Sequence, residues 1–329
     1  MTALAPTLEA FFTERLGHQR QASPNTVSSY RDTFRLLLQY LQRETSKAPS
    51  ALDIADLGAP SIGAFLEHLE RDRHNSVRTR NARLAAIHSL FRFAALRHPE
   101  HAALIERVLA IPPKRSDRAL VSYLVDVEIT ALMSAPDRNG WIGRRDHALL
   151  LLAIQTGMRV SELVRLHCAD LTLSTGPHVR CMGKGRKERA TPLTGQTVAV
   201  LREWLAERKG GPDDPLFPSR RGGQLSPDAV AWLLTKYHQT AARSCPSLRN
   251  KKLTPHTLRH TAAMLLRSAG IDITVIALWL GHESTQSTQI YMHADLAIKE
   301  HALARTRPIQ TAPGRYRPDD ALLAFLDQL

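Results

Sequence analysis

The chain has few cysteines, no long apolar run and no recognisable export signal, and each absence argues against a class of protein. Cys168, Cys181 and Cys245 stand far apart without a Cys-x-x-Cys pair, which argues against a disulfide framework and a zinc knuckle. No apolar stretch reaches the ~18 residues that a membrane-spanning helix needs. The start, MTALAPTLEAFFTERL, lacks the charged and then apolar segments of a secretory signal. We therefore expect a cytoplasmic protein with buried thiols and no membrane partner.

What the chain does have is an excess of positive charge. Its 329 residues include 44 Lys and Arg against 31 Asp and Glu, which gives a net charge of +13 and a pI of about 10.1. The excess is spread along the chain and does not form a basic tail. This distribution favours an anionic polymer, such as a nucleic acid, bound along much of a folded surface.

The first hundred residues have the pattern of a compact helical unit. Ser23 as N-cap and Pro24 at the first helical position predict a helix start, and apolar residues then recur at three- and four-residue spacing. Residues 61–73 form a second amphipathic segment and residues 76–96 a third, with Ser76 as its cap. We therefore expect a bundle of amphipathic helices.

Three arginines lie near the N-terminal end of the third segment, away from its apolar face. Arginine side chains on a helix surface are commonly solvated, but they also bind phosphate groups of DNA. Both interpretations fit the sequence, and the second predicts a DNA-facing helix. The arginines are Arg78, Arg80 and Arg83.

The stretch IPPKRSDRAL, residues 111–120, interrupts the helical pattern. Two prolines cannot continue a helix, and the polar, charged residues that follow are typical of a linker. We accordingly predict a helical DNA-binding domain over 1–111, a linker over 112–120 and a second domain over 121–329.

The second domain mixes helical patterns with one β-prone region. Residues 144–158 are apolar enough for a buried helix, and helical spacing returns from residue 198. Short β-prone runs over 171–194, separated by Gly-Pro and Gly-Lys-Gly, predict a small antiparallel sheet. The expected fold is mainly α with a small antiparallel β-sheet in the second domain.

The stretch GKGRKER, residues 183–189, places a glycine on each side of Lys184 at the tip of a predicted hairpin. Glycines there permit positive φ and close approach to a ligand. A run of this kind is usually a solvated basic loop. The alternative is that Lys184 takes part in chemistry on a polyanion while its basic neighbours hold the DNA backbone. These neighbours are Arg186, Lys187 and Arg189.

Four further stretches carry reactive side chains. They are TGMRVSEL with Arg159 and Glu162, HTLRHT with His256 and Arg259, LGHES with His282, and QIYMH with Tyr291. Taken singly, the Arg–Glu pair is commonly a surface ion pair, the histidines can face solvent, and most tyrosines are half-buried packing groups. Taken together with Lys184, the set suits transfer of a phosphoryl group from a phosphodiester to a tyrosine hydroxyl.

Attack on a backbone phosphate builds negative charge on its non-bridging oxygens. The rigid fork of arginine meets two oxygens at once, so Arg159 and Arg259 are expected to clamp the phosphate. One preorganised donor to developing charge is worth about 3 to 4 kcal/mol. His282 would add a further donor, and Glu162, one helical turn from Arg159, would orient that arginine.

The same reaction needs two proton transfers. The pKa of free tyrosine is about 10, so its proton must be removed near neutral pH. His256 is the expected acceptor of the Tyr291 proton. Lys184 is the expected donor to the departing 5′ oxygen.

In order and context, TGMRVSEL, the Gly-Lys-Gly hairpin, HTLRHTAAMLLRSAG and LGHESTQSTQIYMH resemble the tyrosine recombinase (phage integrase) family, including its Xer-type enzymes. The resemblance covers about residues 118–300 strongly and the helical N-terminal domain more loosely. In that family the matching positions are catalytic, with the tyrosine as nucleophile, and all six are present. They are Arg159, Lys184, His256, Arg259, His282 and Tyr291.

The resemblance implies a C-shaped clamp in which a helical, SAM-like core-binding domain and a catalytic domain grip duplex DNA at a specific site. It implies a 3′-phosphotyrosyl link, a released 5′ hydroxyl that attacks a partner strand, and no metal ion, ATP or other cofactor. Four protomers, of this chain or with a related recombinase, would exchange strands through a Holliday junction. Segment 296–329 would either pass to a neighbouring protomer, as in the Xer-type enzymes, or pack on its own domain.

Several alternatives fit the same residues. A type IB topoisomerase uses the same tyrosine chemistry but rejoins the same strand. A non-catalytic DNA-binding accessory protein would bind DNA without using the six catalytic residues. His256 and His260, followed by His282 and His293, also suggest a zinc hydrolase, but Thr257 stands where that pattern requires glutamate. Base specificity would come from the first domain and from residues 226–243. The sequence leaves transposition, phage or island integration and chromosome-dimer resolution open.

Overall fold

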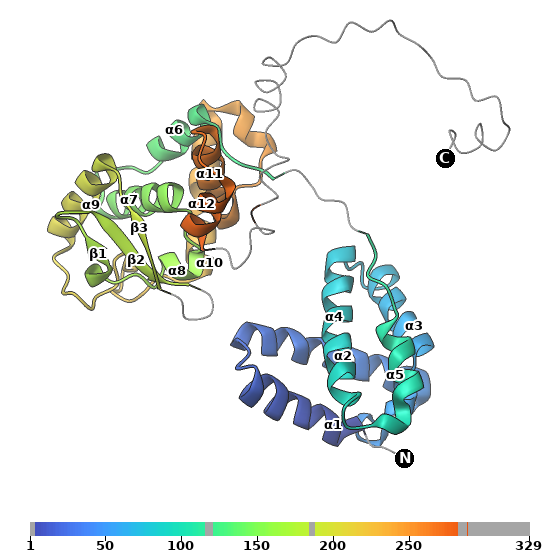
Figure 1. Cartoon of the computed structure of the whole chain (residues 1–329). Helices are drawn as coiled ribbons and strands as arrows, with labels where there is room; N and C mark the ends of the chain where they lie inside the picture. Colours follow the sequence, from blue (N-terminus) through green and yellow to red (C-terminus); the bar gives the residue numbers. More distant parts are fainter. Residues whose placement is uncertain (1–3, 116–120, 184–187, 282–287, 289–329) are drawn as a thin grey trace, which may run out of the picture. The chain divides into compact units, whose positions relative to one another are not determined.

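The computed structural model describes residues 4–115, 121–183, 188–281 and 288, and the chain divides into two compact units (Figure 1). Unit 1 spans Met1–Arg118 and unit 2 spans Ala119–Leu329. The domain bounds 1–111 and 121–329 stay predictions. Among the helices that the structure describes, none is long and apolar enough to cross a bilayer.

Unit 1 is helical. Its elements are α1 (Leu4–Ala10), a π-helical segment (Phe11–Gln19), α2 (Pro24–Thr45), α3 (Ala59–Arg71), α4 (Val77–Ala94) and α5 (Ala102–Leu109), with 3₁₀ turns at Pro49–Ala51, Ile54–Leu57 and Pro99–His101. The predicted caps are confirmed: Ser23 Oγ accepts from Thr26 N at 3.3 Å, and Ser76 Oγ accepts from Thr79 N at 3.2 Å. Each serine satisfies an amide that the first turn would leave unpaired, so α2 and α4 begin where the sequence predicts.

An aromatic cluster holds the helices of unit 1 together. The Phe11 ring is fully buried, stacks on Tyr30 with centroids 6.2 Å apart, and meets Phe34 edge-on at 6.0 Å. Edge-on and offset pairs of this kind add to the gain from burial alone. Apolar residues of α2, α3 and α4 belong to the same hydrophobic core as this cluster.

Unit 2 combines helices with a small sheet. Its elements are α6 (Asp126–Ser134), α7 (Trp141–Thr156), α8 (Val160–Leu163), β1 (Leu171–Thr172), β2 (His178–Met182), β3 (Glu188–Pro192), α9 (Gly195–Arg208), α10 (Pro227–Ser244), α11 (Pro255–Ser268) and α12 (Ile273–Leu280), with 3₁₀ turns at Cys168–Asp170 and Pro246–Asn250. The strands pair antiparallel in the order β1-β2-β3, and Cys181 lies opposite Arg189. The predicted class, mainly α with a small antiparallel sheet, is confirmed.

Helix α7 is the centre of unit 2 and packs against both α9 and α11 (Figure 1). Leu149, Leu150 and Leu152 on this helix are fully buried, as the apolar run predicts. The helix ends at Gly157 with φ +62°, where a Cβ would lie 2.6 Å from Leu280 Cδ2. Only glycine fits this left-handed, crowded position, so the end of α7 lies directly against the end of α12.

A buried polar network fixes α7 to α10. Asp146 Oδ1 accepts from Arg145 Nε at 2.8 Å, and Asp146 Oδ2 accepts from the Tyr237 hydroxyl at 2.7 Å. Arg145 also donates to the Pro218 carbonyl at 2.7 Å. Burial and the Asp146 carboxylate both raise the pKa of Tyr237. This tyrosine is therefore a packing and hydrogen-bonding residue that stays protonated.

Candidate active site

Arg159 lies at the start of α8, two residues after the glycine that ends α7. Its Nη1 donates to Glu162 Oε1 at 2.9 Å, and its backbone amide donates to Glu162 Oε2 at 2.8 Å. Its Nη2 donates to the Gly281 carbonyl at 3.3 Å. The Arg159 side chain remains 29% exposed, whereas that of Glu162 is only 4% exposed. A buried carboxylate thus holds a guanidinium whose outer part reaches solvent.

Glu162 is ionised in this environment. Burial alone would raise its pKa, but the charge of Arg189 and hydrogen bonds from Arg159 outweigh burial and hold the pKa below its usual value. The carboxylate is therefore a fixed negative charge around which the neighbouring arginines arrange.

Arg259 occupies the first turns of α11. Thr254 caps this helix by accepting from Thr257 N at 3.2 Å, and Pro255 fills its first position. The Arg259 side chain is buried, with Nη1 donating to the Gly157 carbonyl and Nη2 to the Leu280 carbonyl, both at 2.7 Å. Two backbone carbonyls from different helices therefore fix the orientation of its guanidinium.

The two arginines meet at the C-terminal end of α12. Arg259 donates to the carbonyl of Leu280, and Arg159 donates to the carbonyl of the next residue, Gly281. The end of a helix carries partial negative charge, which favours cations there. Arg159 and Arg259, 100 positions apart in the chain, are thus brought to the same helix end, immediately before His282 in the sequence.

Two histidines lie beside Arg259 on α11. His256 is exposed, and its ring lies over that of His260 with centroids 6.4 Å apart and planes at 30°. Burial, followed by the charges of His256 and Arg259, lowers the pKa of His260 to about 4. His260 is therefore neutral at physiological pH, and His256 is the histidine that solvent reaches.

The lowered pKa of His260 predicts a pH-dependent stability. The unfolded chain takes up a proton on this residue below a pH of about 6.5, whereas the folded chain does not until about 4. The stability that neutral His260 contributes is full above pH 6.5 and is lost as the pH falls towards 4. We expect the wild-type Tm to drop by about 2–4 °C more than that of His260→Gln between pH 7 and pH 5, after allowing for solvent screening. His256→Gln removes one of the charges that lower the His260 pKa, so its slope should lie between those of the wild type and His260→Gln. Parallel slopes for the wild type and His260→Gln would contradict the assignment.

Five of the predicted site residues lie outside the described residues, and their roles stay predictions. These are Lys184, Arg186, Lys187, His282 and Tyr291. Of the six predicted catalytic residues, Arg159, His256 and Arg259 are described. The structure brings the two arginines together and places His256 on the helix of Arg259.

Arg189 does not lie where the sequence led us to expect it. We predicted a DNA contact, but its Nη2 donates to Glu162 Oε2 at 2.8 Å and its Nη1 to Glu162 Oε1 at 3.3 Å, with the side chain only 12% exposed. Strand periodicity could have indicated this, because Arg189 alternates in β3 with exposed Glu188 and Ala190 and shares a face with buried Thr191.

Arg80 also differs from the expectation. Its side chain is buried, and Nη1 donates to the Pro112 carbonyl at 3.1 Å and to Asn81 Oδ1 at 3.0 Å. It therefore ties α4 to the chain that follows α5 and is not a surface group for DNA. Arg78, two residues earlier on the helix, is exposed.

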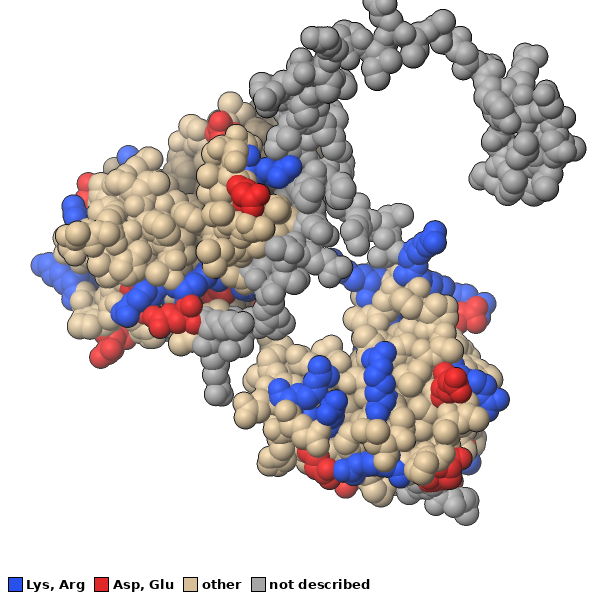
Figure 2. Space-filling model, viewed as in Figure 1, with Lys and Arg blue, Asp and Glu red and all other residues tan. Residues whose placement is uncertain are grey.

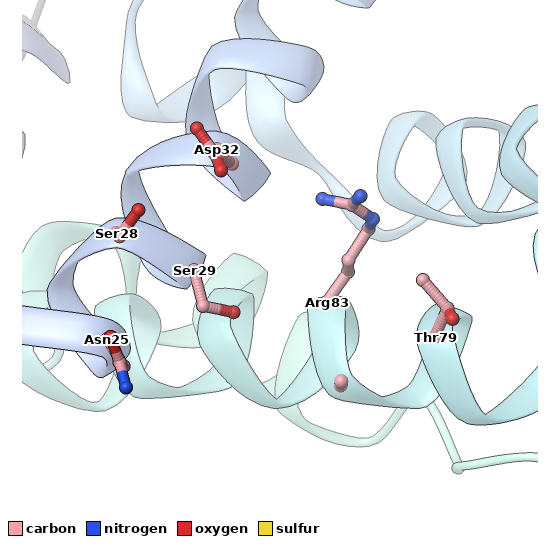
Figure 3. Close-up of a pocket in the computed structure, with 7 residues that line it drawn as sticks. Asn25, Ser28, Ser29, Asp32, Thr79 and Arg83 are labelled. Atoms are coloured by element: carbon pink, nitrogen blue, oxygen red, sulfur yellow. The ribbon is translucent and has the colours of Figure 1, made fainter. Parts of the chain in front are cut away.

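Arg83 faces a pocket of about 350 Å³ between the N-terminal parts of α2 and α4 (Figure 3). Burial, and then the charge of Arg73, lower its pKa. The other lining residues are polar or small: Asn25, Ser28, Ser29, Asp32, Thr79 and Ala82.

Figure 2 shows lysine and arginine side chains on the surfaces of both units. Arg83 is thus half-buried in a polar recess, whereas Arg78 on the same helix is exposed.

Within the described ranges, no three His, Cys, Asp or Glu side chains are grouped so as to hold a metal ion. His256 and His260, the pair that suggested a zinc hydrolase, lie side by side. His282 and His293, the other members of that set, lie outside the described residues.

Comparison with known proteins identifies the family. Residues 122–297, more than half of the chain, match the Phage integrase family, and residues 10–98 match the Phage integrase N-terminal SAM-like domain. The chain belongs to the phage integrase family. The resemblance seen in the sequence motifs is thereby confirmed.

Curated relatives of this phage integrase family member are named as recombinases. The y4rC protein of Sinorhizobium fredii, named as an integrase/recombinase, is 56% identical and the match covers 99% of this chain and 98% of the relative. Tyrosine recombinase XerD of Pseudomonas putida is 33% identical over 94% of this chain and 99% of its own length. This family member is therefore an enzyme that cleaves and rejoins DNA strands.

Solved structures show the same fold. The XerH site-specific recombinase in a post-cleavage complex with its difH substrate aligns with a TM-score of 0.71 at 23% identity, covering 87% of this chain and 81% of that one. The Tn1549 transposon integrase with transposon right end DNA aligns with a TM-score of 0.69 at 16% identity, covering 90% and 98%. At sequence identities this low, the structural similarity establishes that this chain has the integrase fold.

Proposed function

We propose that this enzyme is a site-specific recombinase that cleaves and rejoins DNA through a 3′-phosphotyrosyl intermediate on Tyr291 and a Holliday junction, without metal ion or ATP. The observation that carries the proposal is the convergence of Arg159 and Arg259 on the end of α12. Two guanidinium groups fixed at the same helix end would form a binding site for an anion that both can contact, such as a phosphodiester.

The reaction would proceed as a transesterification. The Tyr291 oxygen attacks the scissile phosphorus, and its proton passes to His256, which is exposed on α11. The bond from phosphorus to the 5′ oxygen breaks, and Lys184 donates a proton to that oxygen. A 5′ hydroxyl of a partner strand then attacks the phosphotyrosine, so one phosphodiester replaces another and no external energy source is consumed.

The arginines stabilise the charge that this attack builds on the phosphate. Their positions are fixed before the substrate arrives, because Arg259 is bound by two carbonyls and Arg159 by Glu162 and one carbonyl. Donors fixed in this way stabilise the transition state by about 3 kcal/mol each, because the protein does not have to reorganise as the charge develops.

The partners would be duplex DNA with a specific recombination site and further protomers in the cytoplasm. Exposed Arg78 and half-buried Arg83 would contact DNA from unit 1, and Arg186 and Lys187 would contact its backbone near the scissile phosphate. Four protomers, of this chain alone or with a related recombinase, would exchange strands, with segment 296–329 passing to a neighbour. Transposition and integration are the roles that the named relatives favour.

The test uses nicked duplexes from the DNA that flanks the gene. A nick placed close to the cleavage point lets the short 5′-hydroxyl fragment diffuse away, so a covalent complex accumulates. We expect a protein–DNA adduct that survives denaturation and whose linked peptide, read by mass spectrometry, contains Tyr291. Relaxation of supercoiled DNA lacking any specific site would favour a type IB topoisomerase instead. Binding without an adduct on any flanking substrate would favour a non-catalytic DNA-binding protein.

A further inference from the structure

The Glu162 carboxylate is shared by two arginines. Oε1 accepts from Arg159 Nη1 at 2.9 Å and Arg189 Nη1 at 3.3 Å, and Oε2 accepts from the Arg159 amide and Arg189 Nη2, both at 2.8 Å. A carboxylate has about four acceptor positions, so these four bonds saturate it. Arg189 therefore supplies half of the contacts that determine where Glu162 lies.

Arg189 also lies against the second anchor of Arg159. A Cβ added at Gly281, whose carbonyl accepts from Arg159 Nη2, would lie 2.5 Å from Arg189 Nη1. Gly281 has φ +63°, a conformation that glycine tolerates best. One side chain from β3 thus binds Glu162 and lies beside Gly281 at the end of α12, the two groups that hold Arg159.

We propose that Arg189 is a positioning residue for cleavage: it holds Glu162 and, by sharing that carboxylate, leaves Arg159 with positive charge to offer the phosphate. The proposal rests on the proposed function, since it assigns Arg189 to the arginine clamp. With both arginines present, the cluster of two guanidinium groups and one carboxylate has a net charge of +1. Without Arg189, Arg159 and Glu162 form a neutral pair, and the carboxylate draws the guanidinium towards itself.

Stability alone does not account for this arrangement. Arg189 Nε is buried without a hydrogen-bonding partner among the residues that the structure describes. An unpaired buried donor is unfavourable, and a buried ion pair contributes little net stability compared with apolar residues of similar size. The unfavourable burial of Arg189 therefore supports a role in the clamp.

The role of Arg189 can be tested by rescue, because it depends on the net charge of the cluster. We would measure the rate of adduct formation on the nicked duplex for Arg189→Gln, Arg189→Lys and the double variant Glu162→Gln/Arg189→Gln. Removing Arg189 should lower the rate about 100-fold, the loss typical of a misplaced catalytic group. The double variant returns the cluster to a net charge of +1, so it should recover at least about 10-fold over Arg189→Gln, and Arg189→Lys should lie between Arg189→Gln and the wild type.

A methylphosphonate at the scissile position provides a second readout, because its neutral methyl group removes the charge that Arg159 would offset. The defect of Arg189→Gln should shrink to less than about 10-fold on this substrate. The matched control is Arg180→Gln on the neighbouring strand, where an exposed arginine pairs with Glu188 at 3.8 Å; its rate should equal that of the wild type.

Each outcome decides one point. A wild-type rate for Arg189→Gln, or equal losses on both substrates without rescue by the double variant, would overturn the positioning role and leave the proposed function intact. No adduct from the wild-type protein would overturn the proposed function and this role with it. Thermal unfolding of every variant establishes that rates are compared between folded proteins.

Discussion

Replacing Tyr291 with phenylalanine should abolish adduct formation on nicked duplexes while leaving DNA binding unchanged. The substitution removes the hydroxyl oxygen that attacks phosphorus and keeps the ring, so only the nucleophile is lost. The residue lies outside the described residues, and the expectation rests on its place in the family motif. We expect the rate to fall by at least about 10⁴-fold, as for loss of a nucleophile in other covalent enzymes. The adduct on a denaturing gel and a binding titration of the same duplex measure the two effects separately.

Tyr237→Phe is the matched control for this substitution. It removes the hydroxyl that donates to Asp146 Oδ2 at 2.7 Å within a buried network. Leaving a buried acceptor with one partner fewer should cost about 1–3 kcal/mol of unfolding free energy, so the Tm should fall while the adduct still forms. An adduct that persists in Tyr291→Phe would contradict the assignment of the nucleophile.

Replacing Arg259 with lysine should lower the rate of adduct formation about 10³-fold, and alanine should lower it further. Lysine keeps the charge but lacks the fork that donates to the carbonyls of Gly157 and Leu280 while facing a phosphate. The loss corresponds to removal of preorganised donors to developing charge. Because two buried carbonyls lose their partners in Arg259→Ala, its Tm should also fall. Rates should therefore be measured well below the Tm of the least stable variant.

Arg144→Gln separates the catalytic effect from the structural one. Arg144 Nη1 donates to the carbonyls of Arg138 and Asn139 at 2.7 and 2.6 Å, a pattern like that of Arg259, but at the start of α7. Its loss should lower stability without changing the rate of adduct formation. A rate for Arg259→Lys close to that of the wild type would remove this arginine from the clamp.

The sequence by itself determined the local structure and the chemistry of the residues involved. Ser23 and Ser76 cap the helices they were predicted to begin, and the apolar run after Arg145 forms the buried α7. These features depend on neighbours in the chain, because a cap acts within one turn and amphipathic spacing repeats every three or four residues. The order of the arginine, lysine, histidine and tyrosine motifs likewise identified the family before any contact was known.

Only the tertiary structure decided what each arginine contacts. In sequence Arg80, Arg83 and Arg189 are equivalent basic residues, yet one is tied to the Pro112 carbonyl, one faces a polar pocket and one is bound to Glu162. The bonds of Arg159 to Gly281 and of Arg189 to Glu162 join positions 122 and 27 residues apart. An arginine's partners follow from which helix ends and strand edges meet when the core of unit 2 packs around α7, and that depends on the whole chain.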